Sequence, residues 1–182
     1  MMSIDTETKL KLYMLIVSRY KDLIAKQEEQ NITELRQRCS PYTNFIKNLK
    51  EQLIARLPVY EYQKNFSQAL PLILGYIESI HNFELSIPFW MSFEEINEIK
   101  AAHPMDKAIL LTALLRSLDV PNTKVLLAKN KRVFVSFEHK SVRHIIIPET
   151  CSTYSGEDMD KLLKENPLEY EFNDLIFETY EE

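Results

Sequence analysis

Glycine is nearly absent from this chain: its 182 residues include only Gly75 and Gly156. A glycine-rich phosphate-binding loop needs several glycines close together, so the sequence excludes nucleotide sites of that type. No apolar run is long enough to span a membrane. Residues 1–5 do not join a basic flank to an apolar core, so we expect no signal peptide and a cytoplasmic location.

Cysteine and basic charge are also scarce. Cys39 and Cys151 are the only cysteines, and neither belongs to a C-x-x-C motif, so we expect free thiols and no zinc site built on cysteines. The 22 Lys and Arg are outnumbered by 27 Asp and Glu, which gives a net charge of -5. A dedicated nucleic-acid-binding protein usually carries a basic surplus, so we do not expect nucleic acid as a partner. The lack of a long apolar run leads us to expect no membrane partner either.

Helical periodicity dominates the first half of the chain. Apolar residues recur at helical spacing over 10–24, 45–57 and 66–80, which predicts three amphipathic helices. Pro71 falls inside the third stripe, so we expect a kink there or a new helix after Gln68.

Two further helices are indicated by their first residues. Ser92 and Glu95 have the spacing of a capping box, which predicts a short helix. Pro104 suits the first position of a helix that is apolar nearly all round as far as Leu118, and such a helix belongs inside a domain.

Beyond residue 124 the apolar period changes to two. We expect strands over 125–127, 133–136 and 145–147, a short helix over 158–165 and a closing hairpin over 170–177. The sequence therefore predicts an α+β domain, with a buried central helix on an antiparallel sheet, over 59–182, preceded by a helical extension over 1–58.

The segment 93–150 resembles the core of the transglutaminase-like, papain-related superfamily. Four stretches carry the resemblance, and the second is the most specific: 92–96, 106–121, 132–137 and 146–150. In that family a Cys at the start of the buried helix attacks an amide carbonyl, a His on the following hairpin transfers the proton, and an Asp orients the His.

The resemblance implies the fold but not the activity. Carried over residue by residue, the family's Cys and His positions fall on Pro104 and Arg132, and its Asp position falls on Pro148, or on Ile147 if the register shifts by one. Proline has no nucleophile, and arginine stays protonated. We therefore expect a pseudoenzyme without a cofactor, which binds a peptide or protein in its cleft, with Arg132 offering a positive charge to a carboxylate.

A displaced thiol site is the alternative enzymatic hypothesis. Cys151 follows the third strand, and with His144 or His139, and Glu149 or Asp106, it could form a rearranged triad in a hydrolase or acyl transferase. The simpler interpretation, which we favour, is a small, partly buried thiol at a strand end.

Other candidate residues have structural explanations of similar weight. His103 and Asp106 could be two metal ligands, with a third from His139 or His144, but Asp106 also suits the helix dipole, and we expect no metal. Trp90 could line a cleft or pack in the core.

The charge distribution and the N-terminal helices bear on partners. Basic residues concentrate over 124–143 and acidic ones beyond 149; we expect the acidic end to fold against the basic hairpins, and a basic patch for an acidic partner is the alternative. The N-terminal helices could form a dimer seam, so a structural or assembly role through them is the third functional hypothesis.

Overall fold

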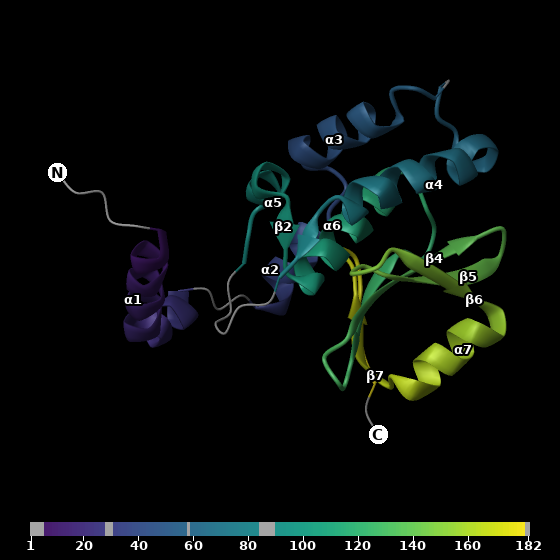
Figure 1. The fold of residues 1–182 in the computed structure, drawn as a ribbon. Coiled ribbons are helices and arrows are strands. Elements are labelled where there is room, and N and C mark those ends of the chain that lie inside the picture. The colour runs from purple at the N-terminus through teal and green to yellow at the C-terminus, as the bar shows by residue number, and fades with distance from the viewer. Residues whose placement is uncertain (1–5, 28–30, 58, 84–89, 181–182) are drawn as a thin grey trace. The chain divides into compact units, whose positions relative to one another are not determined.

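The chain is described by a computed structural model, which covers residues 6–27, 31–57, 59–83 and 90–180. Its contacts divide the chain into two compact units. The smaller unit contains α1 (Thr6–Gln27), and the larger unit contains every other helix and strand of the described residues (Figure 1). The expected helix over 10–24 is therefore confirmed.

The elements of the larger unit follow the expected order of helices first and strands later. Its helices are α2 (Ile32–Arg38), α3 (Asn44–Ile54), α4 (Tyr62–Glu78), α5 (Phe93–Ile99), α6 (Pro104–Ser117) and α7 (Gly156–Glu165). Its strands are β1 (His81–Asn82), β2 (Ala101–Ala102), β3 (Lys124–Ala128), β4 (Val133–His139), β5 (Val142–Ile147), β6 (Ser152–Ser155), β7 (Leu168–Phe172) and β8 (Phe177–Thr179). The α+β class is thus confirmed.

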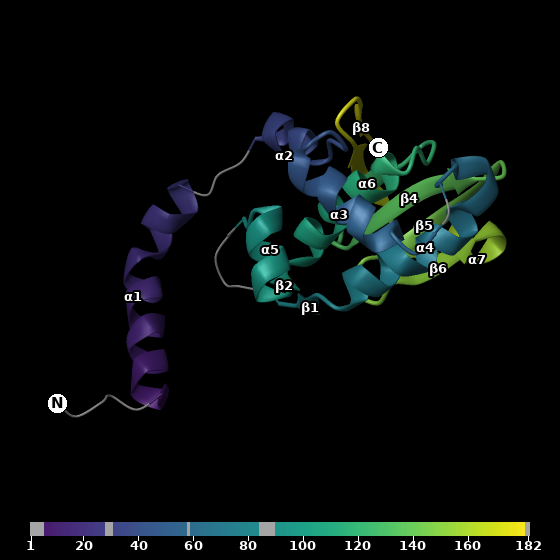
Figure 2. The same cartoon turned by 90° about the horizontal axis from the view of Figure 1, so that it is seen from above.

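A six-stranded antiparallel sheet forms the second half of the larger unit. Its strand order is β6-β5-β4-β3-β7-β8, whereas β1 and β2 form a separate parallel pair. Helices α3, α4 and α6 lie on one face of the sheet and α7 lies on the other (Figures 1 and 2). Helices α2 and α3, which we assigned to the extension over 1–58, contact α6 and belong to the same unit as the sheet.

Helix α6 is the core of the larger unit. Every residue from Pro104 to Leu115 is buried, as the apolar character of this segment predicts. The helix contacts β3 and β4 on the sheet, and α2, α3 and α4 on its other sides. Because α6 is buried on all sides, the sheet and the surrounding helices all pack against it.

Strand alternation assigns side chains to the two faces of the sheet. Leu126, Phe134 and Ile145 form a buried cluster that packs against Leu162 and Leu163 of α7. Side chains that alternate with these point the other way; Phe137, for example, contacts Phe66 of α4 at a ring-centroid distance of 5.9 Å.

The break in α4 does not lie where Pro71 predicts it. The backbone leaves helical geometry at Asn65 (φ -133°, ψ 17°), whereas Pro71 lies inside the helix. The Asn65 side chain accepts a hydrogen bond from the Glu61 N–H and donates one to the Val59 carbonyl. Asn competes with the helical backbone through such local bonds, so the irregularity follows the asparagine and not the proline.

The acidic C-terminal strands pair with the basic hairpins, as expected. Lys124 forms an ion pair with Glu171, Lys131 with Glu169 at 2.9 Å, and Arg143 with Glu171 at 3.7 Å. Much of the basic character of β3–β5 is thereby neutralised within the chain, which weakens the alternative of a basic patch for an acidic partner.

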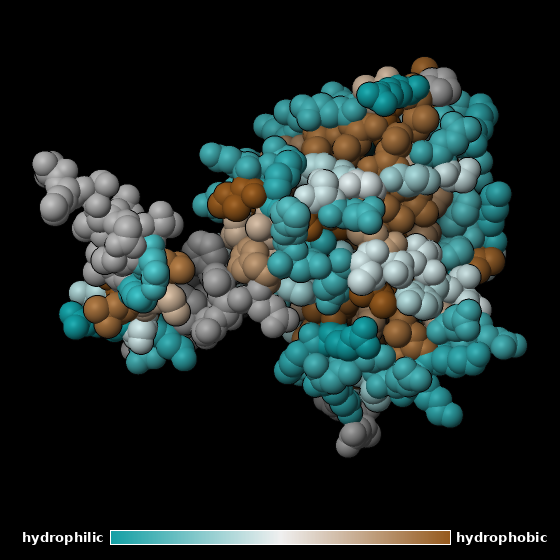
Figure 3. Space-filling model, viewed as in Figure 1, coloured by the Kyte–Doolittle hydropathy of each residue, from teal (hydrophilic) through white to brown (hydrophobic). Residues whose placement is uncertain are grey.

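The surface of α1 is unusually apolar. Eight of its large apolar side chains are exposed: Leu10, Tyr13, Met14, Leu15, Ile16, Val17, Tyr20 and Leu23. Part of this apolar surface is visible in the space-filling view (Figure 3). Among the described residues, no helix has the length and apolarity that crossing a membrane would require.

Asn173 secures the turn between β7 and β8, which suggests a test of this fold. Its buried side chain donates to the Thr123 carbonyl at 2.9 Å and accepts from the N–H groups of Leu175 and Ile176. We expect Asn173→Ala to lower the free energy of unfolding by roughly 1–3 kcal/mol, because buried backbone groups lose their partners. Urea denaturation measures this. The control variant Asn48→Ala, at an exposed position, should have a free energy of unfolding within about 0.5 kcal/mol of wild type. Equal effects of the two substitutions would contradict the role assigned to Asn173.

Candidate functional site

The start of α6, where the family would hold its nucleophile, is built from structural residues. Pro104 is buried at the first helical position, as predicted. His103 precedes it as the N-cap, and its Nδ1 accepts a hydrogen bond from the Met105 N–H at 3.2 Å. The positive end of the helix dipole is therefore next to a capping imidazole and a proline ring, and not next to a thiol.

Asp106 belongs to a buried ion pair at the same place. Its Oδ1 accepts a hydrogen bond from Arg38 of α2 at 2.8 Å, while its Oδ2 has no hydrogen-bond partner among the described residues. Burial raises the pKa of Asp106, and the neighbouring Arg38 opposes that shift. Arg38 also donates to the Met91 carbonyl and lies 5.5 Å from the Phe93 ring centroid, so this pair fixes α2 to α5 and α6.

Pro148 and Glu149 lie beside the first turns of α6. The Glu149 carbonyl accepts a hydrogen bond from the Asn82 amide at 2.9 Å, and Asn82 in turn accepts one from the Lys107 ammonium at 2.9 Å. Lys107 is itself buried and also donates to the Ile80 carbonyl at 3.0 Å. Burial lowers the pKa of Lys107, and Glu149 acts against that shift. Pro148 is buried, as Pro104 is, so neither proline presents an exposed surface to a ligand.

Arg132 does not join these residues. Strand alternation puts it on the same face as Phe134, toward α7, and its guanidinium lies 5.6 Å from the Phe134 ring centroid. Its Nη1 donates to Oδ1 of Asn166, at the end of α7, at 3.4 Å. Of the three family positions, the structure thus places Pro104 and Pro148 on the α6 side and the exposed Arg132 on the opposite side of the sheet.

Cys151 is not brought to a histidine. Its Sγ contacts the carbonyls of Leu74 at 3.6 Å and Pro148 at 3.9 Å, and burial raises its pKa. The register pairs His144 with Ser155, about 10 Å along the sheet from the Ile147–Ser152 pair next to Cys151. Lys107 lies near enough to oppose that shift, but burial outweighs it, and a thiol with a raised pKa is a poor nucleophile.

The remaining candidates also stay apart. His139 lies at the far end of β4 from Cys151. Trp90 is half-buried and belongs to the smaller unit, so we do not assign it to this site. Within the described ranges, His, Cys, Asp and Glu side chains do not gather in threes that could hold a metal ion.

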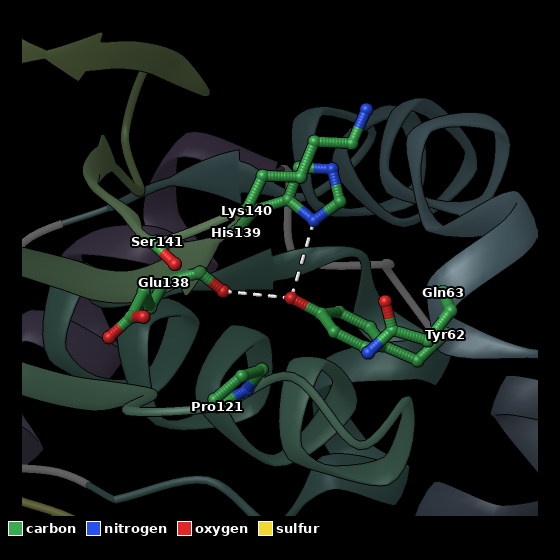
Figure 4. Close-up of a pocket in the computed structure, with 7 residues that line it drawn as sticks. All are labelled: Tyr62, Gln63, Pro121, Glu138, His139, Lys140 and Ser141. Carbon is green, nitrogen blue, oxygen red and sulfur yellow. Dashed lines mark hydrogen bonds between the residues drawn. The ribbon is translucent and has the colours of Figure 1, made fainter.

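An open pocket lies at the tip of the β4–β5 hairpin, and the sequence did not single it out. Its cavity of about 260 Å³ is lined by Tyr62, Gln63, Pro121, Glu138, His139, Lys140 and Ser141 (Figure 4). Tyr62 donates its hydroxyl hydrogen to the Glu138 carbonyl at 3.0 Å, and the same oxygen lies 3.2 Å from Nδ1 of His139. Since that hydrogen is used, Nδ1 of His139 carries a hydrogen and donates to Tyr62.

An aromatic cluster continues from this pocket along the sheet. The Phe66 ring lies 4.8 Å from His139, and Phe137 stacks on His144 at 5.0 Å with an interplanar angle of 17°. Burial lowers the pKa of both histidines. The signal in the sequence was Tyr62 and Phe66 on one helix face together with alternate residues of β4, a pattern that indicates packing more than catalysis.

A second cavity, of about 330 Å³, lies on the sheet beyond α7. Its buried carboxylate, Glu171, accepts hydrogen bonds from Lys124 and from the Tyr180 hydroxyl at 2.8 Å. Burial raises the pKa of Glu171, but these bonds outweigh it and the net shift is downward. The charge of Glu171 is paired within the chain. We therefore interpret the lining of this cavity as a structural ion-pair network without a nucleophile.

The two histidines predict a pH dependence of stability. Their pKa values in the folded chain lie below the ordinary 6.5, so the unfolded chain binds protons first as the pH falls. Their contribution is fully present above pH 6.5 and is lost as the pH falls toward the folded values. We expect His139→Phe/His144→Phe to reduce the slope of unfolding free energy against pH in this range. An unchanged slope would contradict the lowered pKa values of the two histidines. His81→Gln, at an exposed position, is the control.

Comparison of the sequence with protein-family models gives no match, and comparison with curated proteins gives none. Residue roles therefore come from the geometry of this chain. That geometry shows a buried proline at the start of α6, two free thiols whose pKa values are raised by burial, and an exposed Arg132.

Proposed function

We propose that this chain is a non-catalytic protein of the transglutaminase-like type, which acts by binding a protein or peptide partner. The single observation that carries the proposal is the start of α6, where a buried proline and a structural ion pair occupy the place of a nucleophile. A buried helix on an antiparallel sheet is the arrangement that the resemblance implies and supports the proposal, whereas the place of Arg132 on the opposite side of the sheet departs from the family's arrangement.

The two thiols support the absence of catalysis. Cys39 is fully buried, its Sγ contacts the Leu35 carbonyl, and burial raises its pKa well above the ordinary range. Cys151 is half-buried with a raised pKa. Both are free, which suits the cytoplasmic location that we propose.

Arg132 is the residue that we assign to partner binding. Its guanidinium is exposed, is held over the Phe134 ring and is bonded on one side to Asn166. A fixed planar cation loses little side-chain entropy when it takes a carboxylate in a bidentate pair. An acidic peptide segment is therefore the ligand class that this side chain suits.

The absence of catalysis is tested by thiol reactivity. We expect iodoacetamide to label Cys39 only after unfolding and Cys151 slowly in the native protein, because burial disfavours both thiolates. Intact-mass spectrometry measures the rates, with the chain in urea as the control. Rapid stoichiometric labelling of Cys151 that abolishes cleavage of an amide substrate or amine transfer to a glutamine peptide would contradict the proposal.

The role of Arg132 is tested on an array of short acidic peptides. For peptides that bind, we expect Arg132→Ala to weaken affinity roughly ten- to a hundredfold, since a charge-assisted hydrogen bond contributes about 1.5–3 kcal/mol. Arg132→Lys should recover only part, because an ammonium lacks the planar fork. Lys140→Ala, another exposed cation on a different turn, is the matched control. Equal effects of Lys140→Ala and Arg132→Ala would remove Arg132 from the binding site.

A further inference from the structure

The cavity of about 330 Å³ beyond α7 lies on the sheet face that α7 otherwise covers. Lys124 stands two residues before Leu126 on β3, so both side chains point to this face. The register pairs Lys124 with Ser136 of β4 and Leu126 with Glu171 of β7. The face is therefore apolar under α7 and polar beyond it, and its polar side chains are held on neighbouring strands, which makes a rigid site.

One part of the cavity lining is closed within the chain. Glu171 is only 2% exposed, and it accepts hydrogen bonds from Lys124 and from the Tyr180 hydroxyl at 2.8 Å. These bonds fix the Lys124 ammonium and the Tyr180 ring in place. They also leave Glu171 as a structural carboxylate, so a ligand has to be held by other residues of the lining.

Ser136 is a buried polar residue whose hydroxyl is unused. The residue is 2% exposed and lines the cavity, yet its hydroxyl has no hydrogen-bond partner among the described residues. Buried polar groups nearly always have a partner. The partner of this hydroxyl is therefore a molecule that enters the cavity.

Glu138 and Arg143 line the same cavity as unused opposite charges. They are directly opposite each other on β4 and β5, where Cβ atoms are about 4.5–5.5 Å apart. The ion pair of Arg143 with Glu171 spans 3.7 Å, which is too long for a hydrogen bond. Glu138 accepts from the Asn122 amide at 2.6 Å, and within the described part of the chain no cation forms an ion pair with it.

This combination of groups selects a ligand that carries both charges. The carboxylates of Glu138 and Glu171 repel a phosphate dianion, and the cations of Lys124 and Arg143 repel a metal ion. A carboxylate and an ammonium on one carbon match an adjacent guanidinium and carboxylate. The cavity volume of about 330 Å³ is at the small end of the range of roughly 300–1,000 Å³ for ligand pockets, which suits a single amino acid.

We propose that this cavity binds a free α-amino acid. Arg143 and the Ser136 hydroxyl bind its carboxylate, and Glu138, which Asn122 holds in place, binds its ammonium. The Tyr180 ring lines the same cavity and favours an apolar side chain. The inference goes beyond the peptide binding proposed above and does not depend on it, because Arg132 lies before the opposite end of β4.

Isothermal titration calorimetry of the full-length chain with L-leucine tests the ligand class. We expect L-leucine to bind, and isoamylamine and isocaproate to bind roughly tenfold more weakly or worse, because each lacks one of the two charged groups. Absence of binding by L-leucine, L-methionine and L-phenylalanine at millimolar concentration overturns the proposal. Equal affinity for L-leucine and for either single-charge analogue overturns it as well.

Variants of the lining test the assignment of residues. Arg143→Met and Glu138→Gln should each weaken L-leucine binding roughly tenfold or more, since each removes a charge-assisted hydrogen bond, and the Gln side chain keeps an acceptor for Asn122. Ser136→Ala should weaken binding without lowering the unfolding temperature, because no bond within the chain is lost. Unchanged affinity in Arg143→Met or Glu138→Gln overturns the site.

A matched control separates this site from the proposed peptide site. Arg132→Ala, which also removes an arginine, should leave L-leucine binding unchanged, and Arg143→Met should leave the binding of acidic peptides unchanged. Loss of L-leucine binding in Arg132→Ala would contradict a separate site. Thermal unfolding that matches wild type shows that each variant keeps the fold.

Discussion

The burial of α6 against the sheet is the interaction on which the rest of the larger unit depends. A helix that is apolar on all sides needs packing partners on all sides, and β3, β4, α2, α3 and α4 supply them. Its two buried charged residues are each paired, Asp106 with Arg38, and Lys107 with Ile80 and Asn82, whereas the Thr112 hydroxyl has no hydrogen-bond partner among the described residues. Those pairs fix α2, α5 and β1 to the helix, so the polar groups add specificity to an apolar core.

The burial of α6 also limits the chemistry that its first residues can perform. A reactive thiolate needs access to solvent and a nearby base, whereas Pro104 is buried and His103 is used as a cap. Strand alternation then sends Arg132 to the far side of the sheet. The sheet thus separates Arg132 from Pro104 and Pro148, the residues that the resemblance would bring together.

Much of the fold was predictable because local signals agreed with tertiary packing. The Ser92–Glu95 capping box, Pro104 at the first turn of α6 and the period-two strands all appear as expected. Strand β6 was missed because Ser152–Ser155 is short and polar, and it pairs only through its neighbour β5. The kink at Asn65 was misplaced since its cause is a side-chain bond and not a proline. The hairpin pocket was missed because Tyr62 and His139 meet only in three dimensions.

Native-state hydrogen exchange along α6 measures whether burial closes the whole helix. We expect amides from Lys107 to Leu115 to exchange only through global unfolding, with protection equal to the free energy of unfolding measured with urea, because the first turns are closed by Pro104, Asp106 and Arg38. Rapid exchange of the first turns through local opening, while the rest of the helix stays protected, would contradict it, since an opening of that kind belongs to an accessible cleft.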